Sequence, residues 1–182
     1  MDLTQNYTFL SLGDLISLYD EDKVTMVLNA FEPYKDSAAG EYLREKAIPM
    51  EKRDLSRTYL AVSMDDNTIL GFITIGMKCM RVPQENLLSK SVMRQMNIEE
   101  NSGVAQAYLL GQLVRSKNTS SGFGDRLIDF AMEIFRESKR NVGCRIVRLD
   151  CSNELIPYYE KHGFKLVRMN DSGTLNQMII LI

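Results

Sequence analysis

The sequence predicts an α/β (α+β) fold, in which β-strands alternate with helices along the chain. Thr58–Ser63 and Ile69–Ile75 are β-rich runs on either side of a polar turn, which is typical of a hairpin. Tyr108–Val114 is an apolar run of strand length that leads through a glycine-bearing turn into a helix. Because 182 residues suffice for one ordinary core and are few for two, we expect a single domain over residues 1–182.

The first fifty residues carry few clear signals. Tyr7–Leu10 is strand-like, and we expect helix over the next twenty residues. From Asp36 the sequence is typical of a helix that is capped by Asp36 or Ser37 and interrupted near Pro49. The residues that we expect to face inward on this helix are Tyr42, Leu43 and Ala47.

Gly71 lies near the start of the second hairpin strand, where a glycine indicates a bulge or the close approach of another backbone. Residues 83–103 are longer than a simple connection, and apolar residues recur there at helical spacing, namely Leu87, Leu88, Val92 and Met96. Lys90 and Arg94 fall off that stripe, so we expect a short amphipathic helix. It is either an ordinary surface helix or a surface that binds a partner.

The C-terminal third continues the alternation of helix and strand. A helix with Asp125 in its first turn is expected, because from Leu127 its apolar residues fall at helical spacing, namely Ile128, Ala131, Ile134 and Phe135. Arg145–Leu149 is strand-like, and Asn153–Lys161 is expected to be a short helix with Pro157 in its first turn. A closing hairpin pairs Phe164–Met169 with Leu175–Ile182.

The composition is that of an ordinary globular protein, with 45% hydrophobic and 25% charged residues. No apolar run approaches the ~20 residues that span a bilayer, and the first residues lack a basic stretch followed by an apolar one. We therefore expect a cytoplasmic protein that does not enter a membrane. The oligomeric state is open, with a homodimer among the options.

The cysteines and the single histidine do not form a metal site. Cys79, Cys144 and Cys151 include no CxxC pair, and His162 is the one histidine, so we expect no metal. Cys144 and Cys151 flank a predicted strand and are most simply small buried hydrophobic residues; a reactive role is the alternative.

The charge balance argues against a general affinity for nucleic acid. The chain has 22 basic and 24 acidic residues, whereas proteins that bind nucleic acid usually carry a basic excess. Any contact with RNA phosphates would need a local basic patch, for which the candidates are Arg81, Lys90, Arg94 and Arg115.

The turn between the strand at 108–114 and the following helix is suited to an anion. Within the turn from Ser116 to Gly124, residues 119–124 hold two glycines and three hydroxyl residues and lead directly into the helix. A helix N-terminus has unpaired N–H groups and about half a positive charge, so such a turn can bind a phosphate without a lysine. A tight turn with a serine cap is the alternative interpretation.

At this turn the chain resembles the GNAT superfamily of acetyl-CoA-dependent N-acetyltransferases. The family signature is Gln or Arg, two residues, Gly, one residue, then Gly or Ala; residues 119–124 (TSSGFG) match both glycines and depart at Thr119. CRIVRLDCSN (144–153) resembles the family's fifth strand, and YEKHGF (159–164) its tyrosine-bearing helix end. The insertion at 83–103 resembles a subgroup that includes acetyltransferase toxins of toxin–antitoxin pairs. The resemblance covers residues 55–182 well and the first fifty loosely.

The resemblance implies a fold and a site. The fold is a mixed, mostly antiparallel central sheet of about seven strands, splayed between strands 4 and 5 and flanked by helices. The thioester arm of acetyl-CoA would pair with the backbone of Leu113 and Val114. Its pyrophosphate would rest on Thr119, Ser120, Ser121, Gly122, Phe123 and Gly124, where the hydroxyls replace the missing Gln or Arg. Asn153 would contact the pantetheine arm.

Tyr159 is the candidate catalytic residue by the same resemblance, because it matches the tyrosine that protonates the departing coenzyme A sulfur. A phenol, with a usual pKa of about 10, is a plausible acid for a thiolate. The alternatives are a packing role for Tyr159, or the same role for the adjacent Tyr158.

No general base is evident, because the fourth strand offers Gln112 and Arg115 where some relatives have a glutamate. An acceptor amine that is already largely neutral suits such a site, and an α-amine with a pKa near 8 is closer to that state than a lysine near 10.4. Arg115 could otherwise meet an acidic acceptor or a nucleic-acid phosphate.

Our hypothesis from the sequence is an N-acetyltransferase that moves acetyl from acetyl-CoA to a primary amine of a small molecule, peptide or protein. Aminoacyl-tRNA is the runner-up acceptor: the toxin-like subgroup points to it, and the net charge does not. A catalytically degenerate module that binds acetyl-CoA or a partner is a further alternative, which the departure at Thr119 permits.

Overall fold

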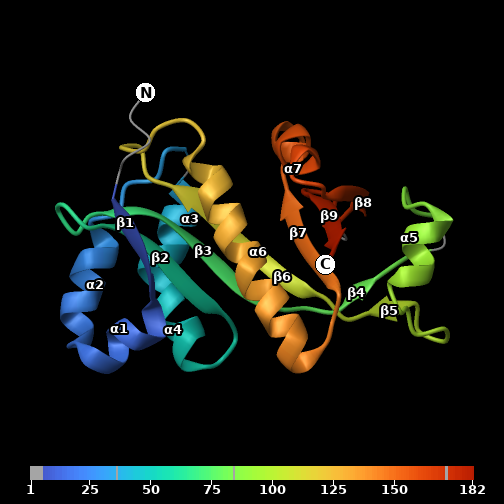
Figure 1. The fold of residues 1–182 in the computed structure, drawn as a ribbon, viewed down its shortest axis with the longest axis horizontal. Coiled ribbons are helices and arrows are strands. Elements are labelled where there is room, and N and C mark those ends of the chain that lie inside the picture. Colours follow the sequence, from blue (N-terminus) through green and yellow to red (C-terminus); the bar gives the residue numbers. More distant parts are fainter. Residues whose placement is uncertain (1–5, 36, 84, 171) are drawn as a thin grey trace. The chain divides into compact units, whose positions relative to one another are not determined.

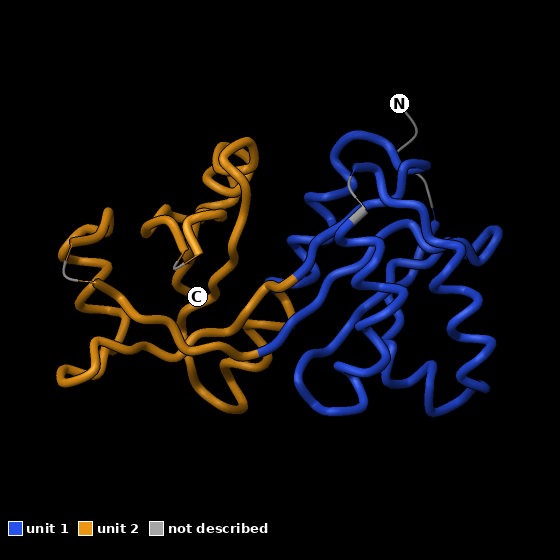
Figure 2. The backbone as a smooth tube through the Cα atoms, turned by 180° about the vertical axis from the view of Figure 1, so that it is seen from behind, with its two compact units in different colours: residues 1–76, 112–132 blue, residues 77–111, 133–182 orange. Residues whose placement is uncertain are grey.

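The computed structural model describes residues 6–35, 37–83, 85–170 and 172–182. The chain forms two compact units, one comprising Met1–Gly76 and Gln112–Met132, the other Met77–Gly111 and Glu133–Ile182 (Figure 2). Strand β6 and helix α6 each contribute residues to both units. We describe each unit by itself.

Seven strands form the main sheet in the order β1-β2-β3-β6-β7-β9-β8 (Figure 1). Their bounds are β1 Tyr7–Ser11, β2 Arg57–Ser63, β3 Ile69–Met77, β6 Tyr108–Arg115, β7 Ile146–Cys151, β8 Lys165–Met169 and β9 Asn176–Leu181. β6 and β7 pair in parallel, whereas β1 with β2, β2 with β3, β7 with β9 and β8 with β9 are antiparallel. The prediction of a mixed, mostly antiparallel sheet of about seven strands is confirmed.

Unit 1 contains the N-terminal helices, with bounds α1 Leu12–Leu18, α2 Glu21–Asn29, α3 Ser37–Glu41, the π-helix η1 Tyr42–Lys46 and α4 Ala47–Lys52. Ser11 caps α1 by accepting the Asp14 N–H, and Asp20 caps α2 by accepting the Asp22 N–H. The expected helical stretch after β1 is therefore two short capped helices. Their apolar faces form one core with the sheet, centred on Leu12, Leu28, Leu43, Leu60 and Phe72.

The interruption that the sequence predicts near Pro49 is a change of helical winding just before the proline, and not an end of the helix. Residues 42–46 form a π-helix, and α4 then runs through Pro49 to Lys52. A proline has no N–H for the usual helical bond, and a π turn accommodates the local change in register. Leu43 and Ala47 are fully buried and Tyr42 is half-buried, as predicted. Of the two predicted caps, Asp36 and the side chain of Ser37 lie outside the described residues.

Gly71 marks a close backbone approach, which was one of the two interpretations of the sequence. A Cβ at this position would lie 2.8 Å from the Val114 carbonyl oxygen and 3.0 Å from a methyl group of Leu127. β3 therefore brings its backbone against β6 here, at the end of β6 that leads into the glycine turn.

Unit 2 contains a two-stranded sheet, a short helix in the insertion and the closing hairpin. The bounds are β4 Met80–Arg81, α5 Lys90–Gln95, β5 Val104–Ala105, the 3₁₀ turn η2 Asn153–Leu155 and α7 Ile156–Lys161. Val92 and Met96 on α5 are buried in a cluster with Met80, Ile146 and Val167, so the predicted amphipathic helix is confirmed. Leu87 is the exception, because it precedes the helix and is 69% exposed.

α6 spans Phe123–Val142 and presents the predicted apolar stripe, on which Leu127, Ile128, Ala131 and Phe135 are buried. In the described part of the chain, none of the helices is both long and apolar enough to cross a membrane.

Candidate functional site

The turn at 116–124 is built around the left-handed backbone of Gly122. Gly122 has φ +95, and a Cβ placed on it would meet nothing within 4 Å. A glycine is thus favoured here because the backbone has a positive φ, and not because a side chain would clash. The next residue begins α6, and the Phe123 ring is buried edge-on against Tyr7 with 5.2 Å between centroids. The side chain of Phe123 is therefore not available to a ligand, while Gly124 lies in the first turn of the helix.

The backbone amides of Ser120, Ser121 and Gly122 have no hydrogen-bond partner among the described residues. The amides on either side are used within the turn, since Thr119 N–H donates to Ser116 O and Phe123 N–H to Ser120 O. The two serines are exposed. Three consecutive free amides at the start of a 20-residue helix form a site suited to an anion.

Thr119 corrects one expectation. It is 7% exposed, and its hydroxyl donates to the Ser116 carbonyl at 2.7 Å. Because its N–H bonds to the same carbonyl, Thr119 has no donor left for a phosphate. The hydroxyls that remain available in the turn are those of Ser120 and Ser121.

Arg115, at the end of β6, reaches over this turn. Its Nη1 donates to the Thr119 carbonyl at 2.9 Å and lies 3.4 Å from the Thr119 hydroxyl oxygen. The guanidinium carbon lies 3.4 Å from the centre of the Tyr34 ring, which is a cation–π contact. The Tyr34 N–H in turn donates to the Arg115 carbonyl at 2.9 Å. Arg115 is thus held beside the turn, within unit 1.

The free edge of β6 lies at Leu113. Gln112 N–H donates to the Thr74 hydroxyl and Ser116 N–H to Leu70 O, so even-numbered residues face β3. Because neighbours alternate along a strand, the N–H and C=O of Leu113 face the other edge. On that edge the described part of β7 pairs with Tyr108 and Leu109, and the Tyr34 N–H bonds to the Arg115 carbonyl. In the described structure Leu113 is therefore left without a backbone partner.

Val114, the other residue expected to pair with the thioester arm, faces the opposite edge. Its carbonyl points toward Gly71 on β3.

Tyr159 lies in α7 of unit 2, and its ring is buried. The residue is 7% exposed and packs edge-on against Phe164, with 5.7 Å between centroids. α7 ends where Gly163 takes φ +87 and the N–H of Phe164 returns to the Tyr159 carbonyl. Burial, aided by the nearby Cys151, raises the pKa of Tyr159 well above its ordinary value. The phenol therefore keeps its proton at neutral pH and can act as a donor.

Asn153 is oriented by a residue that the sequence did not single out. Its Oδ1 accepts a hydrogen bond from Asn176 Nδ2 at 2.6 Å, which leaves its own amide N–H groups as donors. Asn176 is buried on β9, opposite Cys151 in the register. Asn153 and Tyr159 both follow the C-terminal end of β7. No group of three or more His, Cys, Asp or Glu suited to a metal occurs among residues that the structure describes.

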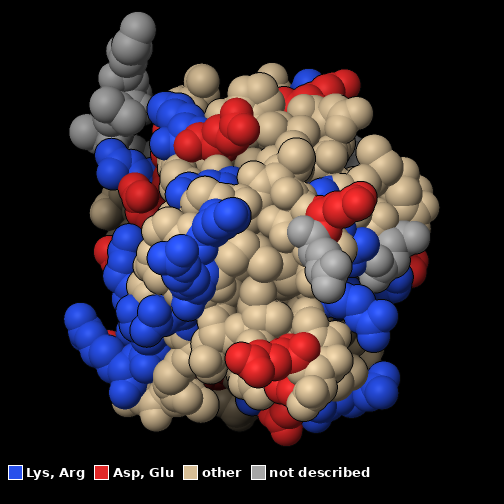
Figure 3. Space-filling view, turned by 90° about the vertical axis from the view of Figure 1, so that its right-hand side faces the viewer, with Lys and Arg blue, Asp and Glu red and all other residues tan. Residues whose placement is uncertain are grey.

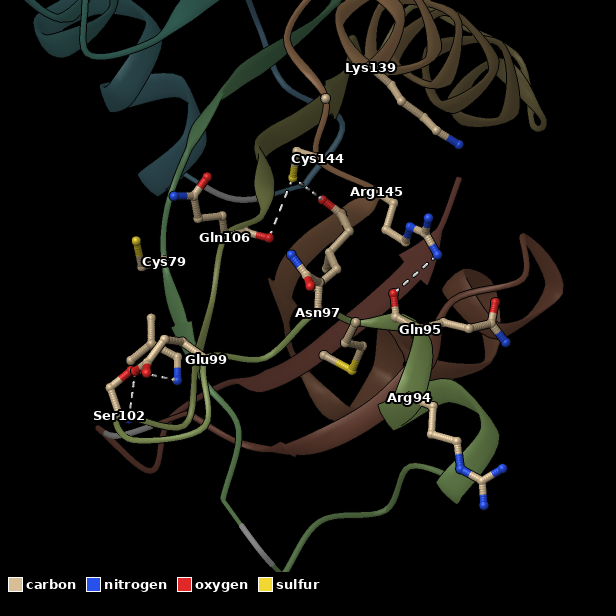
Figure 4. Close-up of a pocket in the computed structure, with 14 residues that line it drawn as sticks. Cys79, Arg94, Gln95, Asn97, Glu99, Ser102, Gln106, Lys139, Cys144 and Arg145 are labelled. Atoms are coloured by element: carbon tan, nitrogen blue, oxygen red, sulfur yellow. Dashed lines mark hydrogen bonds between the residues drawn. The ribbon is translucent and has the colours of Figure 1, made fainter.

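A hollow of about 900 Å³ lies at the opposite end of β7, entirely within unit 2 (Figure 4). Its cationic lining residues are Arg94, Lys139 and Arg145, against one carboxylate, Glu99. Glu99 accepts the N–H groups of Asn101 and Ser102, and hydrogen bonding to Ser102 lowers its pKa. The Arg145 side chain lies near the Gln95 carbonyl, while Arg94 extends outward from α5 (Figure 4).

Cys144 lines this hollow, so the expectation that it is simply buried is wrong. It is half-buried at φ +69, next to Gly143 at φ +83, and both residues lie in the connection between α6 and β7. Cys151 is buried as predicted, and burial raises the pKa of its thiol to about 11.

Basic side chains are unevenly distributed on the surface despite the net charge of −2. Figure 3 shows Lys and Arg most densely along one side of the face it presents, with further Lys and Arg at the opposite edge and Asp and Glu interspersed. Arg81, Lys90 and Arg94, the other three patch candidates, are exposed residues of unit 2.

The partners that position the candidate residues carry no sequence motif. They are Tyr34 and Asn176, and each reaches its partner only through the fold. Arg115 did carry a signal, because it lies four residues before Thr119, at the junction of strand and turn.

Comparisons with known proteins place this fold. No protein-family model and no curated protein matches the sequence. Solved structures do match along nearly the whole chain. The structure of AtaT complexed with acetyl-methionyl-tRNAfMet is 18% identical with a TM-score of 0.76, covering 97% of this chain and 95% of that one. A tyrosine-to-phenylalanine mutant of KacT is 20% identical with a TM-score of 0.75 and the same coverage.

The structure of AtaTR bound with AcCoA is also similar, with 18% identity and a TM-score of 0.68 over 97% of this chain and 93% of that one. At these identities the likeness concerns the fold. The chain has the GNAT fold that its motifs predicted, and its neighbours include toxin-type members of that superfamily.

Proposed function

We propose that this protein is an acetyl-CoA-dependent N-acetyltransferase. The observation that carries the proposal is the row of three free amides, Ser120 to Gly122, at the start of α6. Such a row binds a diphosphate through N–H groups and the helix dipole. The structurally similar AtaTR is bound with AcCoA, which is a ligand of that chemistry.

The residues of the chain support direct transfer. The free N–H and C=O of Leu113 would pair with the amide groups of the pantetheine arm and hold the thioester in a fixed position. Asn153 would add a donor to that arm. Tyr159 would give its proton to the sulfur as the carbon–sulfur bond breaks, after the acceptor nitrogen has attacked the carbonyl carbon. The nitrogen then loses its surplus proton to solvent.

We further propose an aminoacyl-tRNA as the acceptor, in place of the small amine or protein amine that the sequence favoured. The similar AtaT is complexed with acetyl-methionyl-tRNAfMet, the product of such a transfer. The α-amino group of an aminoacyl ester needs little help in losing its proton, which agrees with the lack of a glutamate at Gln112 or Arg115. The basic hollow in unit 2 offers the local patch that an acidic protein needs for RNA phosphates.

The test is transfer of labelled acetyl from acetyl-CoA to purified charged tRNA, compared with polyamines, peptides and uncharged tRNA. We expect labelled N-acetyl-aminoacyl-tRNA and no label on uncharged tRNA. Label on polyamines or peptides alone would refute the tRNA acceptor and restore the first hypothesis. Binding of acetyl-CoA without any transfer would support the degenerate module.

A cellular test addresses the toxin-type activity. We expect expression in a growing bacterium to arrest growth, to produce acetylated aminoacyl-tRNA, and to do neither with Tyr159→Phe. The same substitution type occurs in the similar AtaT and KacT mutants. Tyr158→Phe is the matched control, because it removes the neighbouring phenol. Harmless expression of the active enzyme would rule out the toxin reading.

A further inference from the structure

Arg115 brings a positive charge to position 119, where the GNAT-like signature has Gln or Arg and this chain has a threonine. The GNAT-like signature has Gln or Arg at its first position, where this chain has Thr119 with both donors used inside the turn. Four residues earlier, the Arg115 guanidinium reaches back to that same position and donates to the Thr119 carbonyl at 2.9 Å. Among the described residues it forms no ion pair with a carboxylate.

The hydrogen bond from Arg115 to the Thr119 carbonyl affects the Ser120 N–H, because the two groups belong to one peptide unit. The Thr119 carbonyl and the Ser120 N–H belong to the same peptide group, and in a trans peptide these two point in opposite directions. The guanidinium, by holding the oxygen, orients the Ser120 N–H away from itself, and a cation at the oxygen polarises that N–H. Ser120 is the first of the three free amides.

Tyr34 fixes the guanidinium in this position. Its ring lies against the cation at 3.4 Å, and its N–H bonds to the Arg115 carbonyl. The segment is also tied to the strand by Lys117 N–H bonding to Glu32 O and by an ion pair between the side chains of Lys117 and Glu32. A planar guanidinium can stack on an aromatic ring and donate to a carbonyl at the same time. A lysine cannot reproduce this contact, because its ammonium is a compact point charge.

We infer that Arg115 is a positioning residue for the diphosphate of the coenzyme. It orients the Ser120 amide and places a positive charge at the Thr119 carbonyl, next to the anion site. In this way it takes the role of the Gln or Arg expected at position 119. The inference rests on the proposed function, since it assumes that the anion at this turn is the coenzyme's diphosphate. It excludes a main role for Arg115 in holding an acidic acceptor or an RNA phosphate.

The experiment compares two acetyl donors in Arg115→Gln. Acetyl-CoA carries the diphosphate, whereas S-acetylpantetheine has the same thioester arm without it. We expect the Kd for acetyl-CoA, measured by calorimetry, to rise about ten- to a hundred-fold, as for loss of a charge-assisted hydrogen bond. The KM for S-acetylpantetheine should be unchanged. The affinity of the wild type for acetyl-CoA should also fall more steeply with rising salt concentration than that of the variant.

Arg115→Lys and Arg53→Gln complete the design. Arg115→Lys keeps the charge but not the fork, so its Kd for acetyl-CoA should lie between those of wild type and Arg115→Gln; it also gives the test if the glutamine variant does not fold. Arg53 is an exposed arginine of the same unit, at the end of α4, and Arg53→Gln should leave both donors unaffected.

The outcomes separate the two proposals. If the wild type does not bind acetyl-CoA, the proposed function fails. If the wild type binds and Arg115→Gln binds equally well, the function stands and the role of Arg115 is refuted. Equal losses for acetyl-CoA and S-acetylpantetheine would also refute it, because they would show a general distortion of β6 and not a contribution at the diphosphate.

Discussion

Gly122 is the residue whose backbone opens the turn toward a ligand. Gly122→Asp should abolish acetyl-CoA binding, because it places a negative charge over the three free amides. Gly122→Ala is the matched variant: its Cβ has room, and φ +95 alone should cost it about 1–2 kcal/mol of stability. Urea unfolding measures the backbone strain that the two variants share. Calorimetry measures their affinity for acetyl-CoA. A folded aspartate variant with wild-type affinity would refute the anion site.

Tyr159 is the residue that we expect to set the rate. Tyr159→Phe should slow transfer by roughly a hundred- to ten-thousand-fold, because it removes a proton donor, and leave the Kd for acetyl-CoA nearly unchanged. Single-turnover kinetics and calorimetry separate the two effects. Equal rates for wild type and variant, with a slow Tyr158→Phe, would move the role to Tyr158.

The pH profile tests the same residue independently. Burial raises the pKa of Tyr159, so the protonated donor should persist beyond pH 10. The acceptor α-amine loses its proton with a pKa near 8, so kcat/KM should rise up to about that pH and then level off. A decline of kcat/KM centred below pH 9, in a protein shown to stay folded, would contradict a phenol donor with a raised pKa.

At the scale of elements, Glu51 joins α4 to β2. Its carboxylate accepts the buried Thr58 N–H at 2.8 Å and lies 3.3 Å from Arg57 Nη1. Burial raises the pKa of Glu51, and the bonds from Thr58 and Arg57 offset part of that shift. The carboxylate is thus the partner that the structure gives to this buried strand N–H.

Glu51→Ala should lower the free energy of unfolding by about 2 kcal/mol, because it leaves the Thr58 N–H buried and unsatisfied. Glu51→Gln keeps an acceptor oxygen and should cost less. Chemical denaturation of the two variants checks the difference. Equal costs would show that the ion pair with Arg57, and not the bond to Thr58, is what matters.

For the whole molecule, the uneven charge should decide how tRNA binds. Arg94 lines the hollow, is exposed and has no ion-pair partner in the described chain, so it can be changed without disturbing a contact. Arg94→Gln should raise the KM for charged tRNA and reduce the slope of log affinity against log salt by about 1. The KM for acetyl-CoA should not change. An unchanged salt slope would place the RNA elsewhere.

We also propose that the two units behave as one domain. β6 and α6 are continuous elements that contribute residues to both. Thermal unfolding should therefore show one transition, with equal calorimetric and van't Hoff enthalpies. Two resolved transitions would show that the units unfold separately.

The hairpin strands, the glycine turn before α6 and the tyrosine-bearing helix end were all predictable from the amino-acid sequence. These features depend on residues close together in the chain, through periodicity, capping and backbone conformation, so they can be read locally. The amphipathic α5 was predictable for the same reason. The winding of the helix around Pro49 was not, because a proline signals a disturbance without saying whether the helix stops or changes register.

Which groups of the turn remain free depends on contacts that form in the folded chain. Thr119 turns its hydroxyl inward, Arg115 stacks on Tyr34, and Asn153 is oriented by Asn176, and in the last two cases the partners are far apart in sequence. Cys144 is half-buried for a similar reason, since the fold opens a hollow beside it. Hydrogen-bond partners are chosen by packing, so a motif can indicate where an anion binds but not which donors are left to bind it.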